Sequence, residues 1–152
     1  MSEKKNENGY KGRFREIAAV LHKHEISKGI TPEKLRLILE DLGPTFIKVG
    51  QLMSLRSDIL PKNYCDELQK LCSDVPPMPF YEVEEVLRDS FGYEWQEEFE
   101  WIDETPLGSA SIAQVHRARL KTGEEVVIKV QRKGIYETMA RDIGLMHKLV
   151  SL

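Results

Sequence analysis

The fold is decided by the stretch Pro106–Gln131, which reads PLGSASIAQVHRARLKTGEEVVIKVQ. It contains two runs typical of β-strands: residues 112–120 alternate roughly between apolar and polar side chains, and residues 125–130 are rich in β-branched ones. The glycine-containing turn Lys121–Gly123 separates them, so the stretch predicts an antiparallel hairpin. Lys129 is the only charge inside the second apolar run, and strand alternation points it to the face opposite its two neighbours.

Two interpretations of Lys129 are open. A lone lysine in a strand usually lies on the solvent-facing side of an edge strand. The order of features favours another interpretation: a loop of small residues, a strand, a tight turn, and a strand ending in V-I-K-V. Protein kinases use this order to fold a loop over ATP phosphates and to bring a lysine to the α and β phosphates. The loop here reads GSASIAQ, with serine and alanine where an ordinary kinase has glycines.

The segments SASIAQVHRARL and VVIKVQR resemble the UbiB-like, AarF-domain-containing family of atypical kinases, which carries an alanine-rich loop of the form A-A-A-S-I-G/A-Q-V-H. The resemblance implies that Lys129 and the loop contact ATP with Mg²⁺. The implied loop contacts are Gly108, Ser109, Ala110, Ser111 and Gln114. Gly108 and Ser109 replace two alanines of the family, so we expect a more flexible loop and an added hydroxyl donor for phosphate.

A second match lies upstream, in LGPTFIKVGQLMSLRSDILP, which fits the K-x-G-Q signature of the same family's helical extension. The pattern alone is equally typical of a surface Lys48, a close helix crossing at Gly50 and a solvated Gln51. The resemblance implies that Lys48 and Gln51 project into the site where a protein substrate would otherwise lie, so both are candidate catalytic residues. Arg56 and Asp58 either orient the end of this helix or form a weak surface ion pair.

The chain divides by composition. Residues 1–12 are polar and contain glycine, and we expect a disordered tail there. Helical periodicity from residue 13 to residue 75 predicts an extension of αα-hairpins. The prolines of residues 76–79 predict a stiff connector, and residues 80–152 predict a partial kinase-like small lobe with an antiparallel sheet and a following helix. The predicted fold class is therefore α+β, with the C-terminal lobe of a kinase absent.

Individual elements follow from local signals. A threonine N-cap at Thr31 and the pair Gly43–Pro44 predict one helix that ends as the next begins. Trp95 and Trp101 are expected to be core anchors, since the acids around them would repel the phosphates of a nucleic acid. A last helix is expected from about Ile135. Its predicted apolar side consists of Met139, Ile143, Met146, Leu149 and Val150.

Composition excludes several function classes. The 152 residues carry 25 acids and 22 bases, and a net charge of -3 creates no field that would draw the chain to nucleic acid. No apolar run approaches the ~20 residues that span a bilayer. We therefore expect a cytoplasmic protein, membrane-associated at most in a longer form. Cys65 and Cys72 are expected to be reduced thiols, because no CxxC pair is present and the two lie two helical turns apart.

Phosphoryl transfer needs acids that hold metal and accept a proton. The sequence contains no H-R-D or D-F-G, and Glu137 is the only glutamate beyond Lys129. We therefore predict no metal site within the chain itself and place the metal-binding acids in a C-terminal lobe.

Three functions are open. The first is an ATP-binding fragment of a UbiB-like kinase or ATPase, a family linked to ubiquinone or prenyl-lipid metabolism, incomplete as a catalyst alone. Its expected partners are a nucleotide and the missing C-terminal lobe or another protein, with peripheral contact to a membrane or a prenyl lipid. The alternative is a non-catalytic protein-interaction module. The third, membrane binding by the helix Arg13–Lys28, is weakened by Glu16 and Glu25, which interrupt its basic face.

Overall fold

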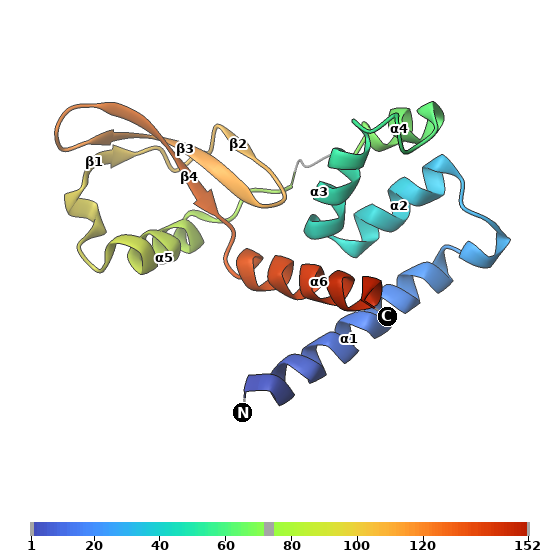
Figure 1. Ribbon diagram of the computed structural model, residues 1–152. Coiled ribbons are helices and arrows are strands. Elements are labelled where there is room, and N and C mark those ends of the chain that lie inside the picture. The colour runs from blue at the N-terminus through green and yellow to red at the C-terminus, as the bar shows by residue number, and fades with distance from the viewer. Residues whose placement is uncertain (1, 72–74, 152) are drawn as a thin grey trace. The chain divides into compact units, whose positions relative to one another are not determined.

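The computed structural model describes residues 2–71 and 75–151, and by packing they form two compact units (Figure 1). The helical unit comprises Met1–Cys72 together with Glu137–Leu152, and the sheet unit comprises Ser73–Tyr136. Helices combined with an antiparallel sheet confirm the predicted α+β class. The sequence analysis grouped the last helix with the small lobe, whereas in the structure this helix packs with the helical unit from Glu137 onward.

The helical unit is built from short helices with well-defined ends. They are α1 (Ser2–Lys23), the 3₁₀ turn η1 (Ile26–Lys28), α2 (Pro32–Leu42), α3 (Pro44–Met53), α4 (Lys62–Leu68) and most of α6 (Ile135–Val150). Thr31 caps α2, because its Oγ1 accepts a hydrogen bond from the backbone N–H of Lys34 at 3.2 Å. Gly43, with φ of 96°, ends α2, and Pro44 opens α3. These ends confirm the predicted αα-hairpin.

A small apolar core holds α2, α3 and α4 together. Leu39, Leu68 and Leu71 are buried at its centre. Partly buried side chains surround them: Leu35, Phe46, Ile47, Met53 and Leu60. Cys65 is a buried free thiol beside this core, and Cys72 lies outside the described residues.

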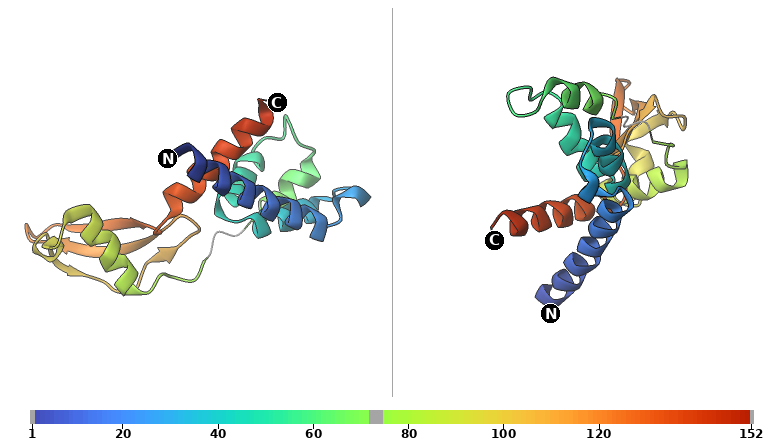
Figure 2. Two further views of the ribbon diagram at one scale, coloured as in Figure 1. Left: turned by 90° about the horizontal axis from the view of Figure 1, so that it is seen from below. Right: turned by 90° about the vertical axis from the view of Figure 1, so that its right-hand side faces the viewer.

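Helix α1 begins at Ser2, where the sequence analysis expected a disordered tail over residues 1–12. Tyr10 of α1 contacts α6, and the right-hand view of Figure 2 shows the two helices at an angle to each other. A Cβ added to Gly144 would lie 2.6 Å from the hydroxyl oxygen of Tyr10, so the absence of a side chain at Gly144 leaves room for the Tyr10 ring in this position. Lys148 Nζ lies 4.4 Å from the centroid of the Tyr10 ring. Local composition does not reveal such a long-range partner.

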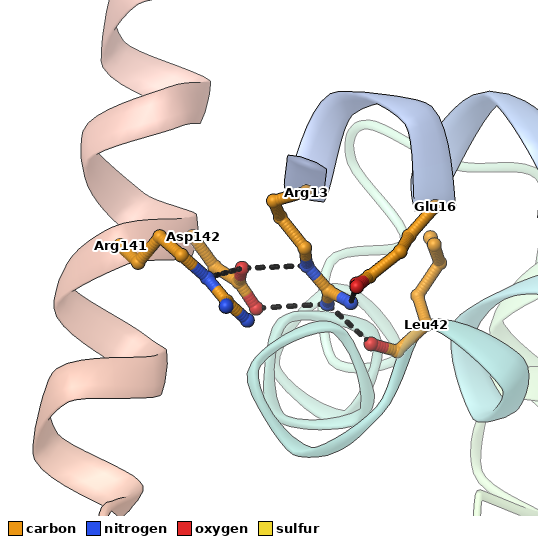
Figure 3. Close-up of polar contacts among 5 residues, drawn as sticks. All are labelled: Arg13, Glu16, Leu42, Arg141 and Asp142. Carbon is orange, nitrogen blue, oxygen red and sulfur yellow. Dashed lines mark hydrogen bonds and ion pairs between the residues drawn. The ribbon is translucent and has the colours of Figure 1, made fainter. Parts of the chain in front are cut away.

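An ion pair between Arg13 of α1 and Asp142 of α6 closes the same interface (Figure 3). Arg13 Nε and Nη2 donate to the two carboxylate oxygens of Asp142 at 2.8 and 3.0 Å, and Nη2 also donates to the carbonyl oxygen of Leu42. The side chain of Asp142 is fully buried, and that of Arg13 is 10% exposed. Burial by itself would lower the pKa of Arg13, but its hydrogen bonds to Asp142 and Glu16 outweigh burial and raise the pKa.

This ion pair also changes which side of α6 is buried. The predicted apolar side was wrong in part, because Ile143, Leu149 and Val150 are exposed by 54%, 49% and 88%. Asp142 and Leu145 are buried instead. The carboxylate of Asp142 is a polar group that periodicity assigns to solvent, and its ion pairs with Arg13 and, at 3.6 Å, with Arg141 make burial favourable.

The sheet unit consists of one helix and an antiparallel sheet. Its elements are α5 (Phe80–Phe91), the 3₁₀ turn η2 (Trp95–Glu97), β1 (Phe99–Ile102), β2 (Gly108–Ser109), β3 (Ala113–Leu120) and β4 (Glu125–Gln131). Strand β3 is central: β4 pairs along its whole length, so β1 and β2 share its other edge. Gly123, with φ of 94°, forms the β3–β4 turn, and its N–H donates to the carbonyl oxygen of Leu120 at 2.8 Å. The predicted hairpin is confirmed.

The two faces of this sheet differ. We call one the core face, because α5 packs on it through Val83 and Leu87 (Figure 2). It carries Gln114, His116, Ala118, Leu120, Val126, Ile128 and Val130. We call the other the open face, since its side chains on β4 are exposed. It carries Val115, Arg117, Arg119, Val127 and Lys129.

The two tryptophans lie on different sides of the sheet. Trp95 is 5% exposed and packs in the core beside Phe99, so its prediction is confirmed. The prediction for Trp101 was wrong, because its side chain is 37% exposed. The pairing register shifts between Phe99 and Trp101, and this bulge places Trp101 opposite Arg119 on the open face. The Arg119 guanidinium carbon lies 6.0 Å from the indole centroid.

Candidate functional site

The strand register brings two of the predicted nucleotide-contacting residues onto one face. Gly108 of β2 pairs with Val115 of β3, and Val115 pairs with Lys129 of β4. Paired residues point to the same side of a sheet, and neighbouring strands lie about 4.8 Å apart, so Gly108 and Lys129 stand roughly 10 Å apart across Val115. A Cβ added to Gly108 would meet no atom within 4 Å, so the space above this position is open.

Lys129 is an exposed cation on this open face. Within the described residues, no acidic side chain forms an ion pair with it, whereas Arg119, farther along the same face, pairs with Glu125 at 2.9 Å. Val127, two residues before Lys129, is 61% exposed, which is unusual for a valine in a sheet. The open face therefore combines an available ammonium group with uncovered apolar surface.

The loop between β2 and β3 is a tight connection. The N–H of Ala110 donates to the carbonyl oxygen of Ala113 at 2.9 Å, and the N–H of Leu107 donates to that of Val115 at 2.7 Å. Ser111 is buried, with 8% of its surface exposed. The loop is thus held by main-chain hydrogen bonds, and the greater flexibility expected from Gly108 and Ser109 stays a prediction.

Gln114 faces the core, away from Lys129, and its side chain is fully buried. Its Oε1 accepts a hydrogen bond from the N–H of Met78 at 2.7 Å, and its Nε2 donates to the carbonyl oxygen of Met78 at 3.3 Å. This pair of bonds fastens the proline-rich connector to the sheet. The side-chain amide is therefore committed to a structural contact, while its predicted role toward a nucleotide stays a prediction.

His116 completes this buried network. Its Nδ1 lies 2.7 Å from the carbonyl oxygen of Asp103, which can only accept, so Nδ1 carries the proton and donates. Its Nε2 is then an acceptor and receives the second N–H of Gln114 at 2.9 Å. Every polar atom of the Gln114 amide has a partner, as burial of polar groups requires.

The sequence analysis did not single out Arg132, which follows β4. Its Nε donates to the carbonyl oxygen of Ala110 at 2.8 Å, and its Nη2 donates to Ser109 Oγ at 2.7 Å and to the carbonyl oxygen of Pro76 at 3.1 Å. A signal was present in the motif VVIKVQR, where an arginine directly follows a buried strand. Its partners are two carbonyl oxygens and one serine hydroxyl, all more than 20 residues away in the sequence, so no local pattern predicts them.

Lys48 and Gln51 belong to α3 in the helical unit, whereas Lys129 and the loop belong to the sheet unit. Lys48 is exposed. Gln51 is half-buried, and its Nε2 donates to the carbonyl oxygen of Leu71 at 3.4 Å. The structure describes these two residues within their own unit, and their predicted catalytic role stays a prediction.

Gly50 allows a close helix crossing in the same motif. A Cβ added there would lie 2.6 Å from Leu39 Cδ1 and would also collide with Leu71 Cδ1. The two leucines are buried core residues, so neither can move aside freely. Of the interpretations that the pattern left open for Gly50, a packing requirement is therefore the one the structure supports.

Arg56 and Asp58 form an exposed ion pair just after α3. Two guanidinium nitrogens of Arg56 donate to the two carboxylate oxygens of Asp58 at 2.8 and 2.7 Å. The hydrogen bond from Arg56 lowers the pKa of Asp58. Their side chains are 57% and 62% exposed, which matches the surface ion pair of the sequence analysis.

Groups of three or more histidine, cysteine, aspartate or glutamate side chains that could hold a metal ion are not found among the residues that the structure describes. Over the same residues, no helix is both long and apolar enough to cross a membrane.

The family described as ABC1 atypical kinase-like domain matches residues 70–152, more than half of the chain. The matched segment contains all four strands, the loop between β2 and β3, and Lys129. The chain therefore belongs to the ABC1 atypical kinase-like family, as the loop and the V-I-K-V strand predicted.

Several relatives share sequence with most of this chain. An uncharacterized protein of the hydrogenase 1 5′ region of Clostridium pasteurianum is 47% identical over 122 residues, which are 80% of this chain and 23% of that protein. The probable protein kinase UbiB of Pseudomonas putida strain GB-1 is 49% identical over 120 residues, or 79% of this chain and 22% of that one. In Marinobacter nauticus, the probable protein kinase UbiB is 41% identical over 128 residues. The chain thus spans less than a quarter of the relatives that it matches.

Among solved structures, the complex of Rv3197 with erythromycin, from Mycobacterium tuberculosis, is similar to this chain. The sequences are 36% identical, and the TM-score is 0.49 over 75% of this chain and 29% of that one.

Proposed function

We propose that this chain is the nucleotide-binding portion of an ABC1-type atypical kinase, and that ATP with Mg²⁺ binds on the open face of the sheet unit. The observation that carries the proposal is the alignment of Gly108, Val115 and Lys129 across three neighbouring strands. Lys129 then contacts the phosphates, and the loop before β3 covers them, as in the kinase arrangement of loop, strand and lysine.

The charge and shape of the open face support this assignment. The exposed ammonium group of Lys129, which pairs with no acid among residues 2–71 and 75–151, is available to a phosphate oxygen. Val115 and Val127 offer apolar surface next to it, on which the flat base of a nucleotide can pack. Gly108 has no side chain, which leaves room for a ligand between the loop and Lys129.

The reaction belongs to the longer proteins of this family. The chain spans less than a quarter of its UbiB relatives, so phosphoryl transfer, a role for Lys48 and Gln51 toward the substrate, and a link to ubiquinone or prenyl lipids are proposals for the whole protein. Metal-holding acids supplied by the rest of that protein would complete the Mg²⁺ site.

Isothermal calorimetry with MgATP tests the nucleotide site. Lys129→Ala is compared with Lys121→Ala, which removes the same charge from the exposed β3–β4 turn. We expect Lys129→Ala to weaken MgATP binding at least tenfold and Lys121→Ala to leave it within twofold. Equal affinity of the parent and Lys129→Ala would refute the assignment of Lys129.

A second candidate function, a protein-interaction module, is favoured by the apolar surface around the end of α3. Leu52, Leu55 and Ile59 are exposed by 59%, 76% and 62%. Leu52 and Ile59 line a largely apolar groove of about 230 Å³, together with Met53 and Leu60. Exposed apolar surface of this kind favours association.

The remainder of the Clostridium pasteurianum relative, produced separately, is the natural probe for this candidate. We expect it to bind the parent chain, and Ile59→Glu to reduce that affinity at least tenfold. Binding that is unaffected by Ile59→Glu would remove the groove as the docking surface.

A further inference from the structure

The guanidinium group of Arg132 joins two separate segments of the sheet unit, Ser109–Ala110 and Pro76. Its acceptors are the carbonyl oxygen of Ala110, Ser109 Oγ and the carbonyl oxygen of Pro76. The backbone N–H of Arg132 adds a fourth bond, to the carbonyl oxygen of Ile112 at 2.8 Å. The loop between β2 and β3 is therefore fastened at both of its ends to one residue.

All acceptors of the Arg132 side chain are uncharged. Among the described residues no carboxylate pairs with it, although the next residue, Lys133, pairs with Glu85 at 2.6 Å. An ion pair with one carboxylate could stabilise a surface arginine as much as hydrogen bonds to three neutral oxygens do. The contacts of this side chain within the described residues are thus with two carbonyl oxygens and one hydroxyl, all from the loop and the connector.

Arg132 holds the loop from the core face. Ser109 pairs with Gln114, and Gln114 pairs with Val130, so these three side chains point to the same side of the sheet. Lys129 lies in the next pair and points to the other side. The bond from Arg132 to Ser109 therefore leaves the open face of the loop clear.

The connector provides a rigid support behind the loop. Prolines fix the backbone of Pro76–Pro79, and the Gln114 amide binds both the N–H and the carbonyl oxygen of Met78. Arg132 binds this same segment through Pro76. Arg132 therefore links the loop to the proline-rich connector, a link that we call the brace. The connector is in turn hydrogen-bonded to the sheet through Gln114.

We propose that Arg132 is a positioning residue, which holds the loop of residues 109–112 in the conformation that receives nucleotide phosphates on the opposite face. The inference rests on the proposed nucleotide site and deepens it. Since the loop's ordered form depends on this brace, phosphate affinity depends on Arg132, while the affinity for the nucleoside part does not.

The chemistry requires arginine in particular. A guanidinium presents several N–H donors in one plane, so Nε and Nη2 reach Ala110 and Ser109 at the same time. A lysine has a single ammonium nitrogen and cannot keep both bonds at these distances. Arg132→Lys therefore keeps the charge and removes the brace. Arg88→Lys, at an exposed position of α5, is the matched control.

Hydrogen exchange of the nucleotide-free chain tests the brace first. We expect Arg132→Lys to accelerate exchange of the Ala110 amide at least fivefold, with the amides of α5 unchanged and with Arg88→Lys equal to the parent. Unchanged exchange at Ala110 would overturn the proposal. Faster exchange throughout the sheet unit would also overturn it, because the residue would then serve general stability.

Calorimetry with MgATP and with adenosine tests the consequence for phosphate. We expect Arg132→Lys to weaken MgATP binding about tenfold and to leave adenosine binding within twofold. Equal loss for both ligands would overturn the positioning role. If the parent chain binds neither ligand, the proposed nucleotide site fails, and the exchange result at Ala110 still decides whether Arg132 holds the loop.

Discussion

The ion pair between Arg13 and Asp142 is expected to hold the helical unit together, and Arg13→Ala removes it. Asp142 is fully buried and receives two hydrogen bonds from Arg13, so the variant leaves the buried carboxylate with the longer contact to Arg141 Nε, at 3.6 Å, in place of those bonds. Removing one partner of a buried pair costs about 3–5 kcal/mol. Because the Arg13 side chain keeps 10% of its surface in solvent, we expect a loss near the lower bound.

Urea unfolding measures this loss, and two signals separate the units. Trp95 and Trp101 both lie in the sheet unit, so tryptophan fluorescence follows that unit, whereas far-UV circular dichroism follows mainly the helices. With a denaturant slope of about 1.5 kcal/mol per molar, a loss of about 3 kcal/mol lowers the dichroism midpoint by roughly 2 M. The fluorescence midpoint is expected to change far less.

Two further variants identify the cause. Glu16→Ala removes only the exposed partner of Arg13, whose side chain is 60% exposed, and is expected to change stability by less than about 0.5 kcal/mol. The double variant Arg13→Met with Asp142→Leu replaces both charges by apolar groups and is expected to recover most of the stability. A dichroism midpoint of Arg13→Ala equal to that of the parent would refute the reasoning.

Three other predictions concern residues whose contacts are specific. Gln114→Leu leaves both backbone groups of Met78 and Nε2 of His116 unpaired, so we expect the sheet unit to lose about 2–4 kcal/mol in urea unfolding followed by fluorescence; an unchanged midpoint would contradict the clamp. Gly50→Ala places a methyl group against two buried leucines, and we expect the helical unit to lose about 1–3 kcal/mol; a gain, as an ordinary glycine-to-alanine change in a helix gives, would contradict the crossing. The hydrogen bonds from Lys70 and then Arg36 lower the pKa of Glu67, so its contribution is present above its ordinary pKa and is lost as pH falls through the lowered one. Glu67→Gln should therefore make the free energy of unfolding fall less as the pH is lowered. The same pH dependence in the variant and the parent would argue against the ion pairs of Glu67 with Lys70 and Arg36.

The elements that local signals define were predictable. The Gly-turn hairpin, the Thr31 cap and the Gly43–Pro44 junction are each encoded within a few residues, and each is found where expected. The strand alternation placed Lys129 on the face opposite Val130, and the register confirms it. A motif of this specificity also identified the family.

The features that could not be predicted from the sequence depend on contacts between residues far apart in the chain. The bulge after Phe99 places Trp101 on the open face instead of the core face, and no residue in this segment predicts a bulge. Asp142 is buried against Arg13, which lies 129 residues away in the sequence and donates two hydrogen bonds to it. The brace formed by Arg132 likewise depends on backbone oxygens that side-chain patterns do not record.

The central claim is that MgATP binds on the open face of the sheet unit. Titration of the ¹⁵N-labelled chain with MgATP, followed by NMR amide shifts, tests it most directly. We expect the largest shifts at Gly108, Val115 and Lys129, with the amides of Val83 and Leu87 on α5 unchanged. Shifts confined to α3 of the helical unit, or no shifts at saturating MgATP, would contradict the account.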